Sequence, residues 1–443
     1  MPEIILSVLV YIFVGVSALM IFRYITNLCL TAKYFKSSKK NRETINDNSG
    51  AKVNMLIMLP CLREQNVIVG SIDYFSKMSL ENINLYIGVA CTHREELTNE
   101  KYGFTRTTAS IAREYIENTT IPDNVKVFVY EANDLNGGDR ATQMNFAVDS
   151  FVADHQDIKL DIVAAFDADS RPTSKTFEEV ARRYRKNPQV SYQQPDVYIG
   201  SASDMKDDGS SILAMANAVY QNSWTMISEI PMLVRYGKKK GKFPGYFYCN
   251  GHGEFFPYEV WKKYRFPEYE ITDGIHIGYR LGMSGAEVEI LDNYGNTDAP
   301  HTVKALPKQH KRWYGGCMRL FSCYKWCKEN DFKPKKTMVA SGLWSQFRWA
   351  FTAPLYCVNL ILSILVAVLF GNFVPIIAMG SLLVVYCYIF GAISLMVTPE
   401  KRKFHFGAFL MVPFAILLKS IGPNIYIFER IFKKKIIYEK VER

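Results

Sequence analysis

Long apolar stretches lie near both ends of the chain and leave a middle of mixed polarity. Residues 4–22 are almost wholly apolar and long enough to cross a bilayer as a helix. Residues 349–370 and 373–397 have the same character and are joined by Gly371 and Asn372. The pattern predicts one membrane span at the N-terminal end and two at the C-terminal end.

Two apolar segments have alternative interpretations. A cleaved signal peptide would begin with basic residues, whereas Glu3 precedes the first stretch and the basic residues follow it. We therefore expect an uncleaved anchor with its N-terminus outside.

Residues 405–428 contain two prolines and Lys419, and a full span would place the basic residues 433–435 outside, against the positive-inside bias. A re-entrant or interfacial segment avoids that conflict.

The middle of the chain alternates short apolar runs with helical patterns. Four runs read as buried strands, at residues 53–59, 85–90, 125–130 and 162–166. Helical patterns fill the gaps, as at residues 105–117 and 140–152. This order predicts an α/β fold with a mostly parallel sheet, which binds ligands at the carboxyl ends of its strands.

Charge and cysteine content narrow the class of protein. The net charge of +10 comes from basic residues clustered beside apolar segments, as at residues 33–42 and 401–403. That placement favours a membrane surface and indicates no nucleic acid partner. The nine cysteines are odd in number and several lie in apolar segments, which excludes a disulfide framework and favours a reducing cytosol. The cluster Cys317, Cys323 and Cys327 lacks zinc-site spacing, so packing or acylation explains it better.

Two aspartates follow the fourth apolar run. Asp167 and Asp169 stand one residue apart, and residues 170–172 supply a turn that can bring their carboxylates together. Such a pair can hold Mg²⁺ or Mn²⁺, and the cation can hold a diphosphate. The alternative is a solvated turn with no ligand.

A second motif, Gln-His-Lys-Arg-Trp at residues 309–313, precedes the C-terminal apolar region. Together with the aspartate pair it resembles the membrane-bound family 2 glycosyltransferases, which include the cellulose, hyaluronan and poly-N-acetylglucosamine synthases. The resemblance implies a GT-A (Rossmann-like) domain with N- and C-terminal transmembrane helices, a nucleotide-sugar donor and Mg²⁺ or Mn²⁺. The implied division is an anchor at 1–31, a cytosolic domain at 50–320, an interfacial segment at 321–348 and a membrane region at 349–428.

The resemblance also implies which residues bind the donor. Pro60 and Glu64 match the opening turn beside the nucleotide, and Arg140 stands where a phosphate-binding lysine is usual. Asp167 and Asp169 match the metal pair, with Asp167 also beside the substrate. The aspartate that usually contacts uracil is missing, and Thr92 or Glu95 could replace its hydrogen bonds.

Other matches fall on the acceptor side. Gln194 and the glycine-rich stretch containing Gly251 and His252 resemble segments that line this region, the two glycines allowing close approach of a ligand. A structural strand and a structural histidine are the alternatives. In the 309–313 motif, Gln309 would bind substrate, Arg312 the diphosphate, and Trp313 would offer a flat face to an acceptor ring.

The general base departs from the family pattern. The family places Glu-Asp before its Leu-Gly-x-Arg-Leu helix, and here the pair is Asp273-Gly274. We expect Asp273 to be the base, with an altered or lost base as the alternative and His276 as a distant candidate. An aspartate at position 274 is then expected to be tolerated.

The sequence thus predicts an inverting membrane glycosyltransferase that extends a polysaccharide from a nucleotide-diphosphate sugar, with a UDP-sugar as the expected donor. Transfer of a single sugar to a lipid and a non-catalytic membrane scaffold are the alternatives. Expected partners are the donor, a polysaccharide or lipid acceptor, membrane lipids, and a second copy or an accessory membrane protein. We expect an integral protein of the cell membrane with its catalytic domain in the cytosol.

Overall fold

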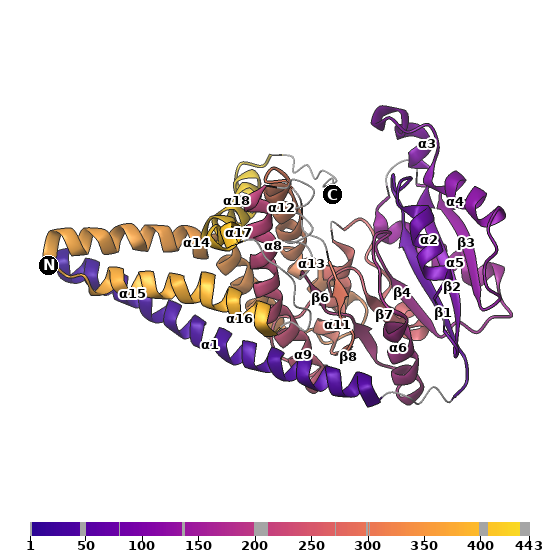
Figure 1. Cartoon of the computed structure of the whole chain (residues 1–443), viewed down its shortest axis with the longest axis horizontal. Helices are drawn as coiled ribbons and strands as arrows, with labels where there is room; N and C mark the ends of the chain where they lie inside the picture. Colours follow the sequence, from indigo (N-terminus) through magenta and orange to yellow (C-terminus); the bar gives the residue numbers. More distant parts are fainter. Residues whose placement is uncertain are drawn as a thin grey trace.

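The computed structural model places an α/β domain beside a group of long helices (Figure 1). The described residues are 2–44, 50–78, 80–134, 138–198, 211–270, 272–297, 300, 302–397 and 406–434. The basic residues 401–403 therefore lie outside the described residues.

The sheet contains all four predicted strands. They are β1 (Val53–Pro60), β2 (Ile83–Thr92), β3 (Val125–Ala132) and β4 (Ile162–Ala165), and each runs parallel to its neighbour. Three further strands extend the sheet in the order β3-β2-β1-β4-β7-β5-β8: β7 (Glu254–Pro257), β5 (Ser191–Gln193) and β8 (Val288–Ile290). Only β7 runs antiparallel to its neighbours in the described part of the sheet. A small second sheet pairs β6 (Asp196–Val197) with β9 (Gly295–Asn296). The predicted α/β fold with a mostly parallel sheet is confirmed.

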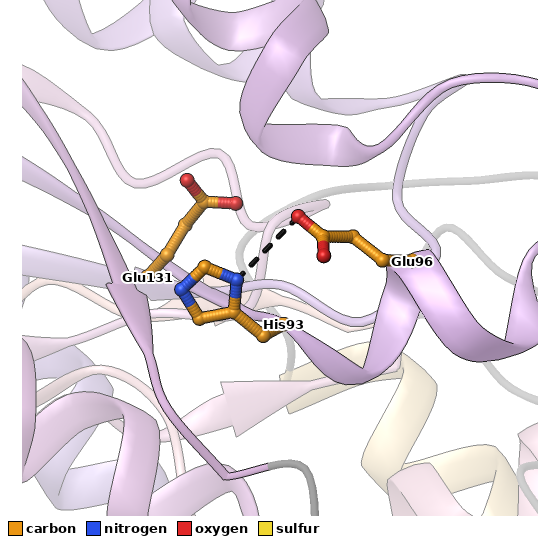
Figure 2. A group of neighbouring side chains, drawn as sticks. All are labelled: His93, Glu96 and Glu131. Carbon is orange, nitrogen blue, oxygen red and sulfur yellow. Dashed lines mark ion pairs between the residues drawn. The ribbon is translucent and has the colours of Figure 1, made fainter.

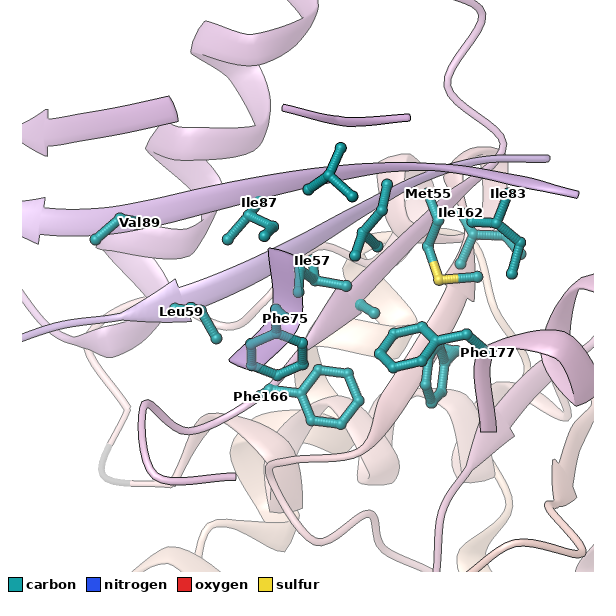
Figure 3. Packing of buried hydrophobic residues seen from close by; sticks show 14 of the residues in the cluster. Met55, Ile57, Leu59, Phe75, Ile83, Ile87, Val89, Ile162, Phe166 and Phe177 are labelled. Atoms are coloured by element: carbon teal, nitrogen blue, oxygen red, sulfur yellow. The ribbon is translucent and has the colours of Figure 1, made fainter. Parts of the chain in front are cut away.

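Alternating side chains bury both faces of the sheet. On β1, Met55, Ile57 and Leu59 point to one face, where Phe75 and Phe177 pack against them (Figure 3). This cluster is covered by α2 (Ile68–Ser76), α4 (Thr108–Glu117) and α6 (Ser174–Lys186). The intervening Leu56 and Met58 point to the other face. That cluster includes residues of α5 (Arg140–Asp154), α9 (Ile230–Lys238), α10 (Tyr258–Tyr264), α11 (Asp273–Ser284) and α13 (Leu320–Glu329).

Shorter elements connect these layers. They are α3 (Arg94–Thr98), η1 (Glu100–Tyr102), α8 (Ile212–Trp224), the π-helical η2 (Thr225–Glu229) and α12 (Ala305–Cys317). All nine cysteines are free, and Cys323 and Cys327 are buried where α13 packs on α11. Packing therefore accounts for these two cysteines.

Within the described residues, three helical segments are long and apolar enough to cross a membrane: Ile4–Arg42, Lys336–Phe370 and Val374–Met396. They correspond to α1 (Pro2–Thr44), α14 (Lys336–Phe370), and the continuous run α15 (Val374–Leu383), η3 (Val384–Ile389) and α16 (Phe390–Val397). Because α14 begins at Lys336, the expected interfacial segment 321–348 is divided between α13 and the start of α14. Residues 405–428, for which two interpretations were left open, fall in α17 (Phe406–Leu410) and α18 (Val412–Ile431). α18 is not among the three candidates; it packs against α8, α12 and α14.

The second half of α1 docks on the α/β domain. Asn27 Nδ2 and Thr31 Oγ1 donate to the carbonyls of Ile227 and Met226, both at 2.6 Å. Tyr34 donates its hydroxyl to the Leu291 carbonyl at 2.5 Å. The helix thus continues past the predicted anchor, which ends at residue 31, and its second half is hydrogen-bonded to the domain.

Phe177→Ala should destabilise the domain, because it leaves a cavity among Phe75, Phe166 and Phe255. We expect the free energy of unfolding to fall by about 3–5 kcal/mol, measured by denaturant unfolding of the full chain in detergent. Leu97→Ala, at a 69% exposed side chain, is the control and should leave the curve in place. Equal stability of both variants would contradict the core assignment.

Candidate active site

A cavity of about 450 Å³ lies between the carboxyl edge of the sheet and helices α1, α8, α12, α14 and α18. Its lining brings together most of the predicted site residues: Arg140, Asp167, Gly251, His252, Asp273, Gln309, Arg312 and Trp313. They come from widely separated positions in the sequence, which the parallel strands and the returning α11 and α12 carry to one edge.

Arg140 occupies the centre of the acidic part of the cavity. Its Nη2 lies 3.1 Å from Asp167 Oδ1, and its Nη1 pairs with Asp273 Oδ2. Burial alone would lower the pKa of Arg140, but Asp273 and Asp167 together hold it above its usual value. A capping box at the start of α5 fixes the arginine, since Asp139 Oδ1 accepts the Thr142 N–H at 2.8 Å.

The aspartate pair lies on one tight turn. The Ser170 N–H donates to the Asp167 carbonyl at 3.0 Å, so the turn begins at Asp167 itself. The Asp167 side chain lines the cavity, whereas Asp169 is exposed and lies outside the lining residues. Two solvent-accessible carboxylates beside a buried cation form an oxygen donor set that fits Mg²⁺ or Mn²⁺ when further oxygens come from a diphosphate.

Figure 2 shows another group of possible ligands, His93, Glu96 and Glu131, whose ligand atoms lie within 4.8 Å of one another. Here His93 Nδ1 is 3.5 Å from Glu96 Oε1, and Glu131 pairs with Arg113. The group does not line the cavity. We assign no metal to it.

The start of α11 explains the unusual Asp273-Gly274 pair. A Cβ on Gly274 would lie 2.0 Å from Gly251 Cα, and one on Gly278 would lie 2.2 Å from the Cys249 nitrogen. Gly251 itself has φ +95°, a conformation that favours glycine. The glycine-rich loop was expected to approach a ligand closely, and its backbone instead packs closely against α11. Gly251 also lines the cavity. The expectation that position 274 tolerates an aspartate is wrong, because the backbone of the loop occupies that space.

Two buried carboxylates at the site were not singled out from the sequence. Asp196 accepts from Asn250 Nδ2 at 3.0 Å and lies 3.2 Å from His252 Nε2, and burial raises its pKa. Glu254 Oε1 accepts the Gly251 N–H at 2.8 Å. Burial, and next the charge of Asp273, raise the pKa of Glu254 to about 8. Asp196 lies two residues after Gln194, and Glu254 lies two residues after His252. Both therefore adjoin residues that were singled out from the sequence.

Gln194 lies outside the cavity lining. Its Nε2 donates to Thr176 Oγ1 at 3.2 Å, in a buried position. The neighbouring Gln193 Nε2 donates to the His252 carbonyl at 3.0 Å and so holds the glycine-rich loop. A substrate contact by Gln194 stays a prediction.

The expected nucleotide side also lies outside this cavity. Thr92 is buried and donates its hydroxyl to Asp134. Glu95 is fully engaged, accepting the backbone N–H groups of Arg63 and Thr108, each at 2.6 Å. Glu95 is therefore poorly placed to replace the missing uracil-binding aspartate.

Pro60 ends β1, and Glu64 follows it in the loop that Glu95 anchors. The Glu64 N–H donates to Thr108 Oγ1 at 3.1 Å. Neither residue lines the cavity. Nucleotide roles for Pro60, Glu64 and Thr92 remain predictions.

Helix α12 presents the second motif to the cavity. Gln309, Arg312 and Trp313 share one face because they stand three and four residues apart. The buried His310 ring lies edge-on to Trp313, with centroids 5.5 Å apart, and burial lowers its pKa to about 3. His276 does not line the cavity; its Nε2 is 2.9 Å from the Gly316 carbonyl, which ties α11 to α12.

Comparisons with known proteins agree with this architecture. The family model "Glycosyl transferase family group 2" matches residues 162–395. A mannosyltransferase from Pyrobaculum calidifontis, solved with GDP-Man and Mn²⁺, is 11% identical with a TM-score of 0.52, covering 96% of this chain and 100% of its own. S. aureus TarS 1-349, solved with UDP-GlcNAc, is 11% identical with a TM-score of 0.33, covering 88% and 98%. The first likeness shows the fold alone, and the second is too low to carry an argument. No curated protein matches the chain.

Gly274→Asp should abolish sugar transfer, because the new side chain must displace the Gly251 backbone and, with it, the start of α11. Activity and thermal unfolding of the full chain would measure the effect. Gly70→Asp is the matched control and should stay active, because Gly70 is an exposed helical glycine whose Cβ would meet only Arg171 Nη2, at 3.9 Å. An active Gly274→Asp enzyme would show that the loop can move away.

Proposed function

Because the chain belongs to glycosyl transferase family group 2, we propose that it transfers a sugar from a nucleotide-diphosphate donor to an acceptor hydroxyl, with inversion at the anomeric carbon. The observation that carries the proposal is the placement of Asp167, Arg140 and Asp273 in contact around one cavity. In this arrangement one cation joins two carboxylates, of which Asp167 would lie on the diphosphate side and Asp273 would act as the base.

Three side chains are proposed to bind the donor: those of Asp167, Asp169 and Arg312. Asp167 and Asp169 would hold Mg²⁺ or Mn²⁺, which when bound supplies positive charge against the leaving diphosphate. Arg312 lines the cavity from α12 and would bind the same phosphates through its planar guanidinium, which can make two parallel hydrogen bonds. The resemblance to polysaccharide synthases favours a UDP-sugar as donor.

Asp273 is the proposed general base. It lines the cavity, and its Oδ2 pairs with Arg140 Nη1. The carboxylate takes the proton of the acceptor hydroxyl, and the oxygen forms a bond to the anomeric carbon from the side opposite the diphosphate. The bond from that carbon to the phosphate oxygen breaks, and the nucleoside diphosphate leaves with the electron pair.

The sequence favours a growing polysaccharide as acceptor. A lipid acceptor is the second candidate, and a specific observation supports it: residues of α1 and α14, both candidate membrane spans, line the cavity. A panel of nucleotide sugars offered to membranes containing the chain tests both, since the product is either a long polymer or a lipid-sized species. Absence of any nucleotide-sugar turnover would instead support the non-catalytic scaffold.

Asp273→Asn should lower the rate of transfer by about 10²- to 10⁴-fold, the usual contribution of a positioned general base. Single-turnover kinetics with a saturating donor would measure it. Asp149→Asn, which breaks a surface pair with Arg265 at 2.6 Å, is the matched control and should retain the wild-type rate. Wild-type transfer by Asp273→Asn would reject the assignment of the base.

Asp169→Ala should remove Mn²⁺ binding in the presence of nucleoside diphosphate, because one of two carboxylate ligands is lost. Calorimetric titration of the full chain measures this without reference to activity. Unfolding should be unchanged, since Asp169 is exposed. Glu96→Ala, in the group of Figure 2, is the control. Loss of Mn²⁺ binding in that variant alone would move the metal site to His93.

A further inference from the structure

Charge is divided unevenly between the two ends of the cavity. The end beside the sheet carries several carboxylates with Arg140 and Arg312. The opposite end, which we call the basic end, is formed by four cations: Arg23 on α1, Arg235 on α9, Arg348 on α14 and Lys419 on α18. Among the described lining residues, these helices and the adjoining η2 contribute one carboxylate, Glu229.

Three of the four cations of the basic end have neutral partners. Lys419 donates to the Tyr220 hydroxyl and stands 4.5 Å from the centroid of the Trp224 ring. Arg348 Nη1 donates to the Tyr24 hydroxyl at 3.1 Å, and Arg235 donates to the Asn27 amide. Within the described residues, no carboxylate lies within ion-pair distance of any of the four.

Glu229 compensates these charges only in part. Its two oxygens accept from the hydroxyls of Tyr248 at 2.8 Å and Thr225 at 2.9 Å. Burial lowers the pKa of Lys419 to about 7, and Glu229 opposes the shift. Holding several cations in one partly enclosed space is costly unless an anion joins them.

Unsatisfied polar atoms lie at the same end. Asn217 Oδ1 and both ring nitrogens of His310 are buried and lack a hydrogen-bond partner among the described residues. Asn217 is 2% exposed and His310 1%, and both line the cavity. Buried polar groups of this kind normally have a hydrogen-bond partner. A polar ligand bound at this end would supply the partners that these atoms lack.

We propose that the basic end binds the phosphate of a phosphorylated lipid, which is the acceptor. This rests on the lipid-acceptor form of the proposed function, since the hydroxyl of that acceptor would reach Asp273 at the other end. The lipid source follows from the helices: α1 and α14 contribute Arg23 and Arg348 to the cavity and leave apolar side chains exposed along their outer faces. A neutral glycan would leave Glu229 as the one carboxylate facing the four cations among the described lining residues of this end.

The test compares three probes on the full chain in nanodiscs of neutral phosphatidylcholine: decyl phosphate, decanol and inorganic phosphate. Quenching of tryptophan fluorescence reports binding, because Trp224 and Trp349 adjoin Lys419. We expect decyl phosphate to bind about tenfold to a hundredfold more tightly than decanol, the worth of a hydrogen bond to a charged group.

Lys419→Gln and, independently, Arg348→Gln should remove most of that preference, whereas Lys419→Arg should keep it. Arg430→Gln is the matched control, since Arg430 is an exposed cation on the same helix outside the cavity lining. Equal binding of decyl phosphate and decanol would overturn the proposal, as would an unchanged preference in folded Lys419→Gln and Arg348→Gln. Inorganic phosphate binding as tightly as decyl phosphate would overturn the lipid assignment.

Donor binding by the wild-type chain separates this proposal from the proposed function. Titration with a nucleoside diphosphate and Mn²⁺ reports only the acidic end. No donor binding together with a clear preference for decyl phosphate would reject the proposed function and leave the basic end standing. Donor binding without any preference for decyl phosphate over decanol would reject only the proposal that a lipid phosphate binds at the basic end.

Discussion

The active site depends on a single guanidinium that joins carboxylates from two elements far apart in the sequence. Arg140 contacts Asp167, just beyond β4, and Asp273, at the start of α11. Without that cation, the two carboxylates would face each other in a partly buried space, where like charges repel. The arginine therefore holds together Asp167 and Asp273, for which we propose metal-binding and general-base roles.

Much of the domain follows from local patterns. The four apolar runs became β1, β2, β3 and β4 because their alternating side chains fill both faces of the sheet. Parallel strands end at a common edge, which is why Asp167 and Arg140 could be expected to meet. The antiparallel β7 was not expected, since its short segment gives no sign of the strand with which it pairs.

Contacts that depend on tertiary packing could not be predicted from local sequence patterns. Gly251 has the same local sequence whether its backbone faces a ligand or a helix, and only the fold shows that it faces Gly274. The buried carboxylates of Asp196 and Glu254 have no sequence signature that separates them from exposed ones. Thr92 lies outside the cavity lining and donates its hydroxyl to Asp134, a contact that no sequence pattern indicated, so its expected nucleotide role stays a prediction.

The 43 residues of α1 give it a length of about 65 Å, roughly twice the hydrocarbon thickness of a bilayer. Its second half is held to the α/β domain by hydrogen bonds from Asn27, Thr31 and Tyr34. A helix that spans a thinner or thicker membrane adapts by tilting. Since the domain is bonded to the same helix, a change of tilt would also turn the cavity relative to the lipid surface, so bilayer thickness would affect how the cavity meets the membrane.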